Sequence, residues 1–418
     1  MSSQGPLSDL TVVEMTAHRA GPFCGALLAD LGAEVVKIER PGAGDPARDQ
    51  GPGPAGKSGY FMANNRNKRS VTVDLKTDAG REATRDLLAD ADVFIENFGY
   101  GVTDKLGIGY DDVREFNEGI IYASIKGYGE TGPLKEKKGL DLILQAEGGI
   151  MSVTGPEGGE PVKVGQAIGD LSAGMFAAIA ILARLHERDR RLGSSAEGED
   201  SSGDVDGNAD GEFVGKFDVG LFDAIVSIMN EYFTFNEMTG EVPGPQGTSH
   251  QSLVPYQLFE TADGHVVTGV PSDDRWDDFV DMLGREELRQ YQTNAERVEH
   301  EEEVVGVIQE EFAEEPTDYW LDELTDAGFP NGPLNDVGDV VDHDQARARG
   351  LVRRHDDPDA GEVVLPGHPV NFPDFDTDIR SPAPRLGEHT EEVFADVAGE
   401  QTTLDDWRAE GAFGGRDE

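Results

Sequence analysis

Asp170 is the carboxylate of this chain whose sequence surroundings suit catalysis. Asp170 lies in residues 165–174, which are otherwise rich in Gly and Ala and lead into a long apolar run. Small residues let a backbone and a substrate come close, and N–H groups at a helix start can hold a developing oxyanion, so Asp170 is a candidate catalytic carboxylate. An Asp before an apolar periodic run is also a favoured helix N-cap. The residue types leave both interpretations open.

Basic side chains are the second group with chemical potential. The chain has 35 Lys and Arg residues against 83 Asp and Glu, only 11 of the 35 are Lys, and the last of these is Lys216. In so acidic a chain, a basic side chain that is retained is expected to have a specific structural or ligand-binding role. Many lie within or beside the N-terminal elements: Lys37, Arg40, Arg48, Arg66, Lys68, Arg69, Lys76, Lys105, Lys126, Lys137 and Lys138. Together they indicate a polyanionic ligand, although solvated charge or helix pairing explains any single one.

Short apolar runs alternate with helical stretches through the first 125 residues. The expected strands are 10–15, 35–39, 70–75, 93–97 and 120–125, and the expected helices are 23–31, 79–89 and 111–117. This alternation is typical of parallel βαβ units, so we expect an α/β, Rossmann-like domain that binds its ligand at the strand ends. The loop after the first strand, residues 18–25, lacks a G-x-G-x-x-G pattern. That absence disfavours a dinucleotide-dependent dehydrogenase.

Composition and pattern divide the chain into four regions. Residues 1–220 are expected to form the large Rossmann-like domain, with helices at 141–149 and 171–191 and an acidic insertion of Ser, Gly, Asp and Glu at 194–212. Residues 221–253 read as a linker helix. Residues 254–330 read as a smaller α+β domain, with two strands around a turn and helices at 274–283, 301–312 and 317–327. Residues 331–418 are predicted to be an extended, Pro- and Gly-rich segment that returns to the large domain.

The composition restricts partners and compartment. A formal net charge of −48 disfavours a nucleic-acid partner, because such affinity comes from basic residues that neutralise phosphates. Acidic excess with few lysines is typical of a salt-rich cytoplasm, where the Debye length at about 1 M salt is about 3 Å and self-repulsion is screened. Cys24 is the only cysteine, and no metal-ligand spacing occurs, so no metal is predicted. With no secretory start and no apolar run of about 18 residues, we expect a cytoplasmic protein with no membrane partner.

The chain resembles the class III coenzyme A transferases, the family of formyl-CoA and carnitine CoA transferases, with α-methylacyl-CoA racemase as a relative. The resemblance spans nearly the whole chain apart from the acidic insertion. It is carried by residues 20–23 (AGPF), 28–42 (LADLGAEVVKIERPG), 67–70 (NKRS), 74–76 (DLK), 96–98 (ENF), 127–129 (GYG), 145–146 (QA), 169–170 (GD), 331–333 (NGP) and 382–390 (PAPRLGEHT).

The resemblance implies an interlocked homodimer of ring-shaped chains, with coenzyme A as substrate and no permanently bound cofactor. It places the family's nucleophile on Asp170, which would pass through an aspartyl anhydride and an aspartyl-CoA thioester. The implied CoA contacts are Arg19, Ala20, Arg40, Val73, Lys76, Asn97, Phe98, Lys105 and Lys138. The implied substrate-side residues are His18, Asp141 and Gln145.

Departures from the family pattern bear on the substrates. The formyl-CoA enzymes have Gln where this chain has Arg19, and their glycine-rich active-site loop has no clear counterpart, which disfavours formyl-CoA and oxalate. Arg19 and His18 predict instead an acceptor with a distal carboxylate, such as mesaconate or citramalate, with succinyl-CoA as a candidate donor; the other interpretation is that both side chains only contact CoA or the fold. The alternative is a racemase or another CoA-thioester isomerase. Leu140 stands where the racemases have His, so two-base proton transfer lacks one partner.

Overall fold

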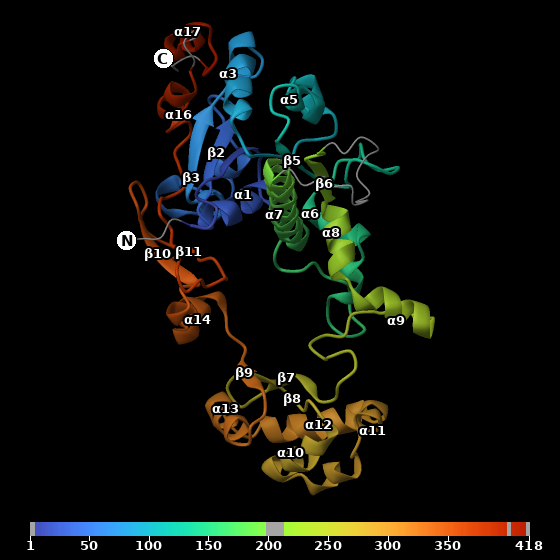
Figure 1. The fold of residues 1–418 in the computed structure, drawn as a ribbon. Coiled ribbons are helices and arrows are strands. Elements are labelled where there is room, and N and C mark those ends of the chain that lie inside the picture. Colours follow the sequence, from blue (N-terminus) through green and yellow to red (C-terminus); the bar gives the residue numbers. More distant parts are fainter. Residues whose placement is uncertain (1–4, 198–212, 399–402, 415–418) are drawn as a thin grey trace. The chain divides into compact units, whose positions relative to one another are not determined.

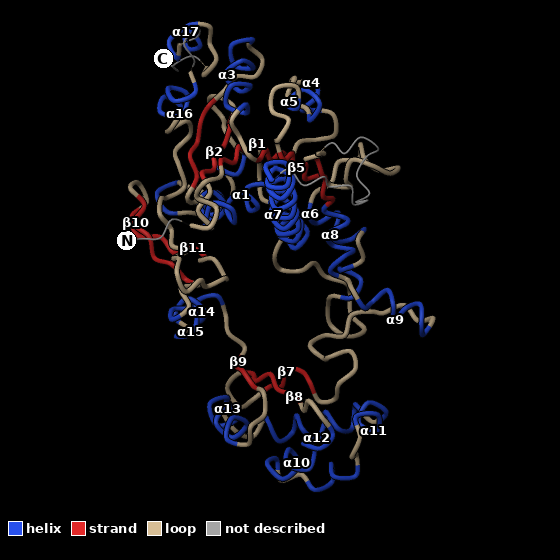
Figure 2. Tube along the Cα trace, in the orientation of Figure 1, coloured by secondary structure: helices blue, strands red, loops and turns tan. Residues whose placement is uncertain are grey.

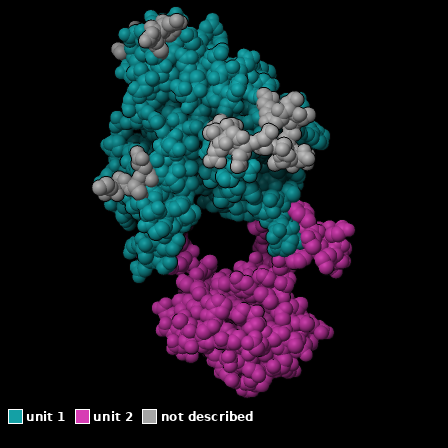
Figure 3. Space-filling view, in the orientation of Figure 1, with its two compact units in different colours: residues 1–150, 164–231, 344–418 teal, residues 151–163, 232–343 magenta. Residues whose placement is uncertain are grey.

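The computed structural model describes residues 5–197, 213–398 and 403–414. The chain divides into two compact units (Figure 3). Unit 1 comprises residues 1–150, 164–231 and 344–418, and unit 2 comprises residues 151–163 and 232–343. Of the predicted acidic insertion 194–212, the first four residues continue a helix, and residues 198–212 lie outside the described residues.

A parallel sheet forms the centre of unit 1 (Figures 1 and 2). It has six strands, all parallel, in the order β3-β2-β1-β4-β5-β6. The strands are β1 (Thr11–Met15), β2 (Glu34–Glu39), β3 (Lys68–Thr72), β4 (Val93–Glu96), β5 (Ile121–Lys126) and β6 (Lys216–Gly220). This is the doubly wound arrangement of Rossmann-type domains. The expected α/β fold with a parallel sheet is confirmed.

Alternate residues of each strand bury on opposite faces of the sheet. On β1, Val12 packs with α1 (Ala20–Asp30), α7 (Ile168–Glu197) and α8 (Leu221–Ile228), while its neighbour Val13 packs with α3 (Asp78–Ala89). The α3 face also carries α5 (Tyr110–Arg114), α16 (Thr390–Val397) and α17 (Leu404–Ala409). Because successive side chains of a strand point to opposite sides, apolar runs of this kind predict a sheet covered on both faces, as found.

Helix α7 is longer than predicted at both ends, since it begins at Ile168 and ends at Glu197. Its small face, including Ala173, Ala177 and Ile181, is buried against α1 and α8. By length and composition, residues 168–191 would suffice to cross a membrane, and 44% of the most apolar window is buried inside the fold. Core helices pass the same test, so this is a weak indication of a span.

Short helices complete the sheet end of unit 1. They are α2 (Gly59–Asn65), α4 (Val102–Lys105) and α6 (Asp141–Glu147), with 3₁₀ turns at Pro46–Asp49, Pro54–Gly56 and Ile150–Val153. Helix α2 begins behind Ser58, whose hydroxyl accepts the Phe61 N–H at 3.0 Å. Helix α6 confirms the predicted helix 141–149, although it ends two residues earlier, at Glu147. Helix α2 has no counterpart among the predicted elements.

Unit 2 contains the antiparallel sheet β7-β8-β9, formed by β7 (Tyr256–Glu260), β8 (His265–Gly269) and β9 (Asn331–Pro333). Its helices are α9 (Glu231–Thr239, which begins at the last residue of unit 1), α10 (Trp276–Leu283), α11 (Asn294–Glu299), α12 (Glu301–Phe312), α13 (Thr317–Asp326) and α14 (Val337–Asp342), with 3₁₀ turns at Asp273–Arg275 and Glu286–Gln290. Phe259, Trp276 and Phe312 are fully buried in its core.

The C-terminal segment is more structured than expected. Besides α14, α16 and α17 it holds α15 (Asp344–Ala348) and a hairpin of β10 (Val352–Asp357) and β11 (Gly361–Pro366), which corrects the prediction of an extended segment from residue 331. The chain then runs along β3: the His389 N–H donates to the Ser70 carbonyl at 2.9 Å, and the Asp74 N–H donates to the Ala412 carbonyl at 2.7 Å. The Pro and Gly content suggests an extended chain because it does not show where the backbone hydrogen bonds of this segment go. In the structure these bonds are made along β3 and within short capped helices.

Candidate active site

Several predicted site residues follow the carboxyl ends of neighbouring strands. His18 and Arg19 come after β1, Arg40 follows β2, and Asn97 follows β4. The strand order reverses between β1 and β4, and ligands of open α/β sheets bind outside such a switch point. Asn97 Nδ2 donates to the Ala17 carbonyl at 2.8 Å, and Asn97 Oδ1 accepts the Ala17 N–H at 2.8 Å. These two bonds join the loops on either side of the switch point.

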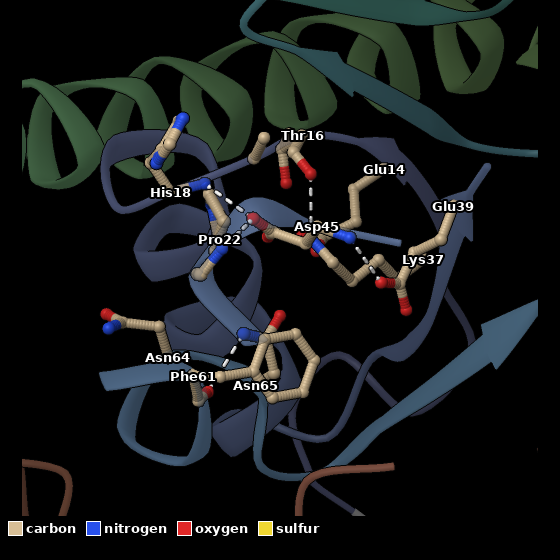
Figure 4. A network of polar contacts seen from close by, with 12 residues as sticks. Glu14, Thr16, His18, Pro22, Lys37, Glu39, Asp45, Phe61, Asn64 and Asn65 are labelled. Carbon is tan, nitrogen blue, oxygen red and sulfur yellow. Dashed lines mark hydrogen bonds and ion pairs between the residues drawn. The ribbon is translucent and has the colours of Figure 1, made fainter. Parts of the chain in front are cut away.

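A buried ion cluster lies beneath the first of these loops, made of Glu14, Lys37, Asp45 and Lys68 (Figure 4, which labels all but Lys68). Lys37 Nζ is 3.4 Å from Glu14 Oε1 and 3.1 Å from Asp45 Oδ2, and all three side chains are fully buried. Lys68 Nζ donates to both Glu14 oxygens, at 2.8 and 3.0 Å. Burial is the main cause that lowers the pKa of Lys68 to about 8.

The same cluster holds the backbone of the loop. Lys37 Nζ donates to the Thr16 carbonyl at 2.7 Å, and Asp45 Oδ1 accepts the His18 N–H at 3.0 Å. His18 has a φ of 63°, in the left-handed region that a non-glycine residue adopts only with support. Figure 4 shows its ring directed away from Asp45. The cluster therefore fixes the path of the chain into Arg19.

The cations of the N-terminal elements fall into two groups. Lys37, Arg48, Arg66, Lys68, Arg69, Lys126 and Lys137 form ion pairs with acidic side chains of unit 1. Their charges are used within the fold, which corrects the expectation that the whole set serves a ligand. Arg40, Lys76, Lys105 and Lys138 are exposed and form no ion pair with any residue that the structure describes. These four remain available to a polyanion.

The first turn of α7 is held by Asp141, the first residue of α6. Asp141 Oδ1 accepts the N–H of Gly169 at 2.8 Å and that of Asp170 at 3.3 Å. The Ile168 N–H donates to the Gln166 carbonyl at 2.9 Å. Asp170 lies inside the helix, so its interpretation as the N-cap is wrong: Asp141 performs that function from another helix. These N–H groups are occupied, so they cannot form the oxyanion site expected at this helix start.

The Asp170 carboxylate itself has no such partner. It is half-buried and accepts no hydrogen bond and forms no ion pair within the described parts of the chain. Burial, followed by the negative charge of Asp141, raises the pKa of Asp170 to about 7, and the positive charge of Arg19 partly offsets the rise. A half-buried carboxylate that titrates near neutral pH and has no structural partner is typical of a reactive group rather than a structural one.

Asp141 and Gln145, predicted to lie on the substrate side, have every side-chain polar atom engaged by the fold. Gln145 Nε2 donates to Asp141 Oδ2 at 2.7 Å and to the Gln166 carbonyl at 3.2 Å, and Gln145 Oε1 accepts the Val164 N–H at 2.9 Å. Gln145 is buried. Both side chains therefore support the segment that leads into α7.

Two residues beside Arg19 were not predicted as part of the site. Arg19 Nη1 donates to Gln166 Oε1 at 3.0 Å, and the Arg19 guanidinium lies 4.5 Å from the centre of the Tyr60 ring. The Tyr60 phenol is close enough to Asp170 for their charges to interact, and burial raises its pKa. Tyr60 belongs to the unpredicted helix α2, and Gln166 lies in the predicted segment around Asp170 without a distinctive spacing. No local signal places either beside Arg19.

The remaining predicted CoA contacts are placed by backbone bonds. Ala20 is the buried first residue of α1, and the buried Val73 donates its N–H to the Glu39 carbonyl at 2.9 Å. The Phe98 N–H donates to Glu96 Oε2 at 2.9 Å, and Lys126 Nζ donates to the Phe98 carbonyl at 2.8 Å. Within the described residues no group of three or more His, Cys, Asp or Glu gathers as a metal site.

Comparison with known proteins decides the family. The model of CoA-transferase family III matches residues 7–200 and 205–390. The chain belongs to CoA-transferase family III. It is 37% identical to the succinyl-CoA:glutarate CoA-transferase of Mus musculus over 400 residues, 94% of this chain and 87% of that protein. It is 36% identical to the succinyl-CoA:mesaconate CoA-transferase of Haloarcula hispanica over 406 residues, 94% of this chain and 97% of that protein.

The fold comparison agrees. A CAIB/BAIF family protein from Brucella suis has a TM-score of 0.80 and 34% identity, over 95% of this chain and all of that one. This CoA-transferase is therefore an enzyme that moves coenzyme A from an acyl-CoA to a carboxylic acid. The racemase alternative lacks one of its two proton-transfer partners, because the side chain of Leu140, before Asp141, is exposed and apolar and cannot move a proton.

Proposed function

We propose that this CoA-transferase moves CoA from succinyl-CoA to a dicarboxylic acid, with Asp170 as the nucleophile. The observation that carries the proposal is the Asp170 carboxylate: it is half-buried, has no partner among the described residues and titrates near neutral pH. A structural carboxylate at a helix start is normally used as a cap, and here Asp141 has taken that function.

The reaction is a series of acyl transfers at one carboxylate. An oxygen of Asp170 attacks the acyl carbonyl of succinyl-CoA, the C–S bond breaks, and CoA leaves as a thiolate from a mixed anhydride. The thiolate then attacks the aspartyl carbonyl, which releases succinate and leaves an aspartyl-CoA thioester. The acceptor carboxylate attacks this thioester and forms a second anhydride with release of the thiolate. Attack of the thiolate on the acceptor acyl carbon yields the new acyl-CoA and restores Asp170.

A carboxylate suits this chemistry because both covalent intermediates keep the acyl group activated, whereas a serine ester would be too stable to return it. With a pKa of about 7, Asp170 is about half ionised at neutral pH. Ionisation supplies the nucleophile, so the rate of the first step should rise with pH through this value.

The CoA site is proposed at the carboxyl edge of the sheet, on Arg40, Lys76, Lys105 and Lys138, with Ala20, Val73, Asn97 and Phe98 shaping it. The phosphates of CoA are anions, and these four exposed cations form no ion pair with the described residues. In a chain with 83 acidic residues, cations without acidic partners support a specific anionic ligand.

The acceptor is proposed to be a dicarboxylic acid such as mesaconate, citramalate or glutarate, with Arg19 on its distal carboxylate and His18 beside it. Arg19 uses Nη1 for Gln166 and stacks on Tyr60, which orients the guanidinium without neutralising it. The names of the relatives in mouse and Haloarcula, which include glutarate and mesaconate, support this choice.

We further propose that the enzyme is a homodimer of interlocked chains. The face of α7 that holds Met175, Phe176, Ile179 and Leu182 is opposite its buried alanines, and Ile179 is 62% exposed. An apolar helix face of this kind is typical of a subunit interface. Ile179→Glu should convert the dimer to monomer or aggregate in light scattering, and an unchanged dimer would contradict this use of α7.

The charge of −48 and the scarcity of Lys support a salt-rich cytoplasm as the working compartment, with neither nucleic acid nor membrane as partner. Assays therefore belong in molar KCl. Loss of both structure and activity on dilution to about 0.1 M salt is the expected result, because the Debye length then grows to about 10 Å and acidic repulsion is no longer screened.

The central experiment measures CoA transfer from succinyl-CoA to a panel of mono- and dicarboxylic acids, with wild type, Asp170→Ala and Arg19→Gln compared in molar KCl. Asp170→Ala should lose at least about 1,000-fold in kcat, the scale expected for removal of a covalent nucleophile. Arg19→Gln should lose more activity with dicarboxylates than with monocarboxylates. Intact-protein mass spectrometry should find a CoA adduct on wild type and on Arg19→Gln but not on Asp170→Ala.

Two results would overturn the proposal. Full activity of Asp170→Ala would show that the nucleophile lies elsewhere. Wild type that is inert in transfer but epimerises a 2-methylacyl-CoA would favour the isomerase instead. If turnover occurs only with monocarboxylic acids, the transferase stands and the dicarboxylate choice fails.

A further inference from the structure

Asp141 is bound to the start of α7 by more contacts than a helix cap requires. Its Oδ1 atom accepts two N–H groups, those of Gly169 and Asp170, and its Oδ2 atom accepts Nε2 of Gln145. An ionised carboxylate only accepts hydrogen bonds, so it suits a position where three donors converge. Gln145 in turn binds the Val164 N–H, which extends the same set of bonds to the segment before α7.

Glycine at position 169 is explained by this contact. A Cβ atom there would lie 3.0 Å from Asp141 Oδ1 and 2.8 Å from Cδ1 of Ile225. The N-terminus of α7 thus approaches Asp141 so closely that a side chain would push the carboxylate away. Gly169 therefore leaves room for the Asp141 carboxylate, and that carboxylate in turn holds the backbone N–H of the next residue, Asp170.

Asp141 also sets the charge around Asp170. The charged or titratable groups that interact with the Asp170 carboxylate are Asp141 from α6, Arg19 from the loop before α1, and Tyr60 from α2. Of these, only Asp141 is both negative and bonded to the Asp170 backbone.

We propose that Asp141 is a positioning residue of the transfer reaction: it fixes the first turn of α7, and with it the Asp170 backbone, and it keeps a negative charge against the nucleophilic carboxylate. The inference rests on Asp170 being the nucleophile. It assigns Asp141 and Gln145 to the support of the nucleophile rather than to the substrate, and it gives the Asp141 charge a role that a neutral cap would not fill.

The test uses Asp141→Asn and Asp141→Ala in the full-length enzyme, with kcat and kcat/KM for succinyl-CoA measured from pH 5.5 to 9 in molar KCl. Asp141→Asn removes the charge and keeps an acceptor oxygen. The acidic limb of its profile should move to lower pH by about one unit, because Asp170 then ionises more readily. Asp141→Ala also removes the anchor, so kcat should fall by about 10- to 100-fold at every pH while the KM for succinyl-CoA stays within about twofold.

Asp406→Asn is the matched control. Asp406 is also a carboxylate in the first turn of a helix, α17, where it accepts the Thr403 N–H at 3.0 Å and the Thr403 hydroxyl at 2.7 Å. It should leave both the pH profile and kcat unchanged. Gly169→Ala is a second variant that moves Asp141 without altering its charge, and it should lower kcat with a smaller shift of the acidic limb.

The pH dependence of CoA-adduct formation, followed by intact-protein mass spectrometry, gives a readout that a purely structural role would not move. An acidic limb that is unmoved in Asp141→Asn, together with normal kcat in folded Asp141→Ala, would overturn the inference while transfer and the adduct in wild type keep the proposed function. Absence of an adduct in wild type, or activity in Asp170→Ala, would overturn the proposed function itself.

Discussion

Two acidic side chains of unit 1, Asp45 and Asp170, have pKa values shifted in opposite directions. Asp45, in the buried ion cluster, accepts the N–H groups of His18 and Ala47 and faces Lys37 at 3.1 Å. Asp170, at the start of α7, accepts nothing from the described residues. Burial raises the pKa of both, but at Asp45 Lys37 and the two N–H donors outweigh it and hold the pKa below its usual value. At Asp170 the pKa rises to about 7.

Hydrogen-bond and ion-pair partners, rather than burial, account for the different pKa values of Asp45 and Asp170. A buried carboxylate with a cation and two donors is stabilised as an anion and holds its loop in place. A half-buried carboxylate beside another carboxylate is destabilised as an anion, which makes it a reactive group with a cost in stability. The buried ion cluster positions the loop of Arg19, and the start of α7 leaves the half-buried Asp170 carboxylate without a hydrogen-bond partner among the described residues.

The largest expected effect is on the buried ion cluster. Lys37→Met leaves Glu14 and Asp45 buried beside each other with less positive charge, so we expect a loss of about 3–5 kcal/mol in the free energy of unfolding. Denaturation by urea at constant molar KCl measures it. A loss below about 1 kcal/mol would mean that water reaches the cluster and that it does not behave as a buried site.

The second effect concerns stability and pH at Asp170. Its pKa is raised in the folded state, so the folded protein binds more protons than the unfolded chain between about pH 4 and 7, and stability falls as pH rises through this window. The rise of the pKa from 3.8 to about 7 corresponds to about 4 kcal/mol at full burial. Solvent at the half-buried carboxylate reduces this value, so Asp170→Asn should stabilise the enzyme by about 2 kcal/mol at pH 8 and by less at pH 5.

Asp45→Asn is the control for Asp170→Asn, and its effect on stability should have the opposite sign. The pKa of Asp45 is lowered in the folded state, so its contribution is present above the unfolded pKa and lost as pH falls. The substitution should destabilise the enzyme at pH 8. Thermal unfolding of both variants at the two pH values decides the matter, and equal signs at pH 8 would refute the contrast.

The third effect is on ligand affinity. Lys138→Gln should raise the KM for succinyl-CoA about fivefold with kcat nearly unchanged, since one solvent-exposed charge contact contributes about 1 kcal/mol. Lys135→Gln is the comparison, three residues earlier, because Lys135 Nζ already donates to the Tyr100 hydroxyl at 2.9 Å. Equal effects of the two substitutions would argue against a specific role of the unpaired cation.

The smallest effect is expected at an exposed cluster of unit 2. Arg289 is paired with Asp277, Asp281 and Glu286 on the surface. Arg289→Gln should leave the unfolding midpoint in molar salt unchanged, because exposed pairs gain little and are screened. A marked drop would indicate that surface pairs, as well as the buried ion cluster, stabilise this fold at high salt.

Much of unit 1 was predictable because its strands are apolar and its helices are amphipathic. Strands β1, β2, β4 and β5 fall within a residue of the predicted bounds, and α3 (Asp78–Ala89) begins one residue before the predicted 79–89. Strand β3 begins earlier, at Lys68, because a lysine buried by Glu14 has no apolar signature. The short helices α2 and α14–α17 were missed, since they are set by caps and by packing on other elements rather than by a long periodic run.

The sequence by itself determined the alternation of the parallel sheet, the family and the position of Asp170 within its Gly-rich segment. Only the tertiary structure decided what Asp170 does in the fold, because the group that caps α7 comes from Asp141, 28 residues before Gly169 and on another helix. It also decided which cations are paired and which are left for a ligand. Hydrogen bonds and ion pairs depend on distances in space, and the distances between residues far apart in the chain are set only when the elements pack.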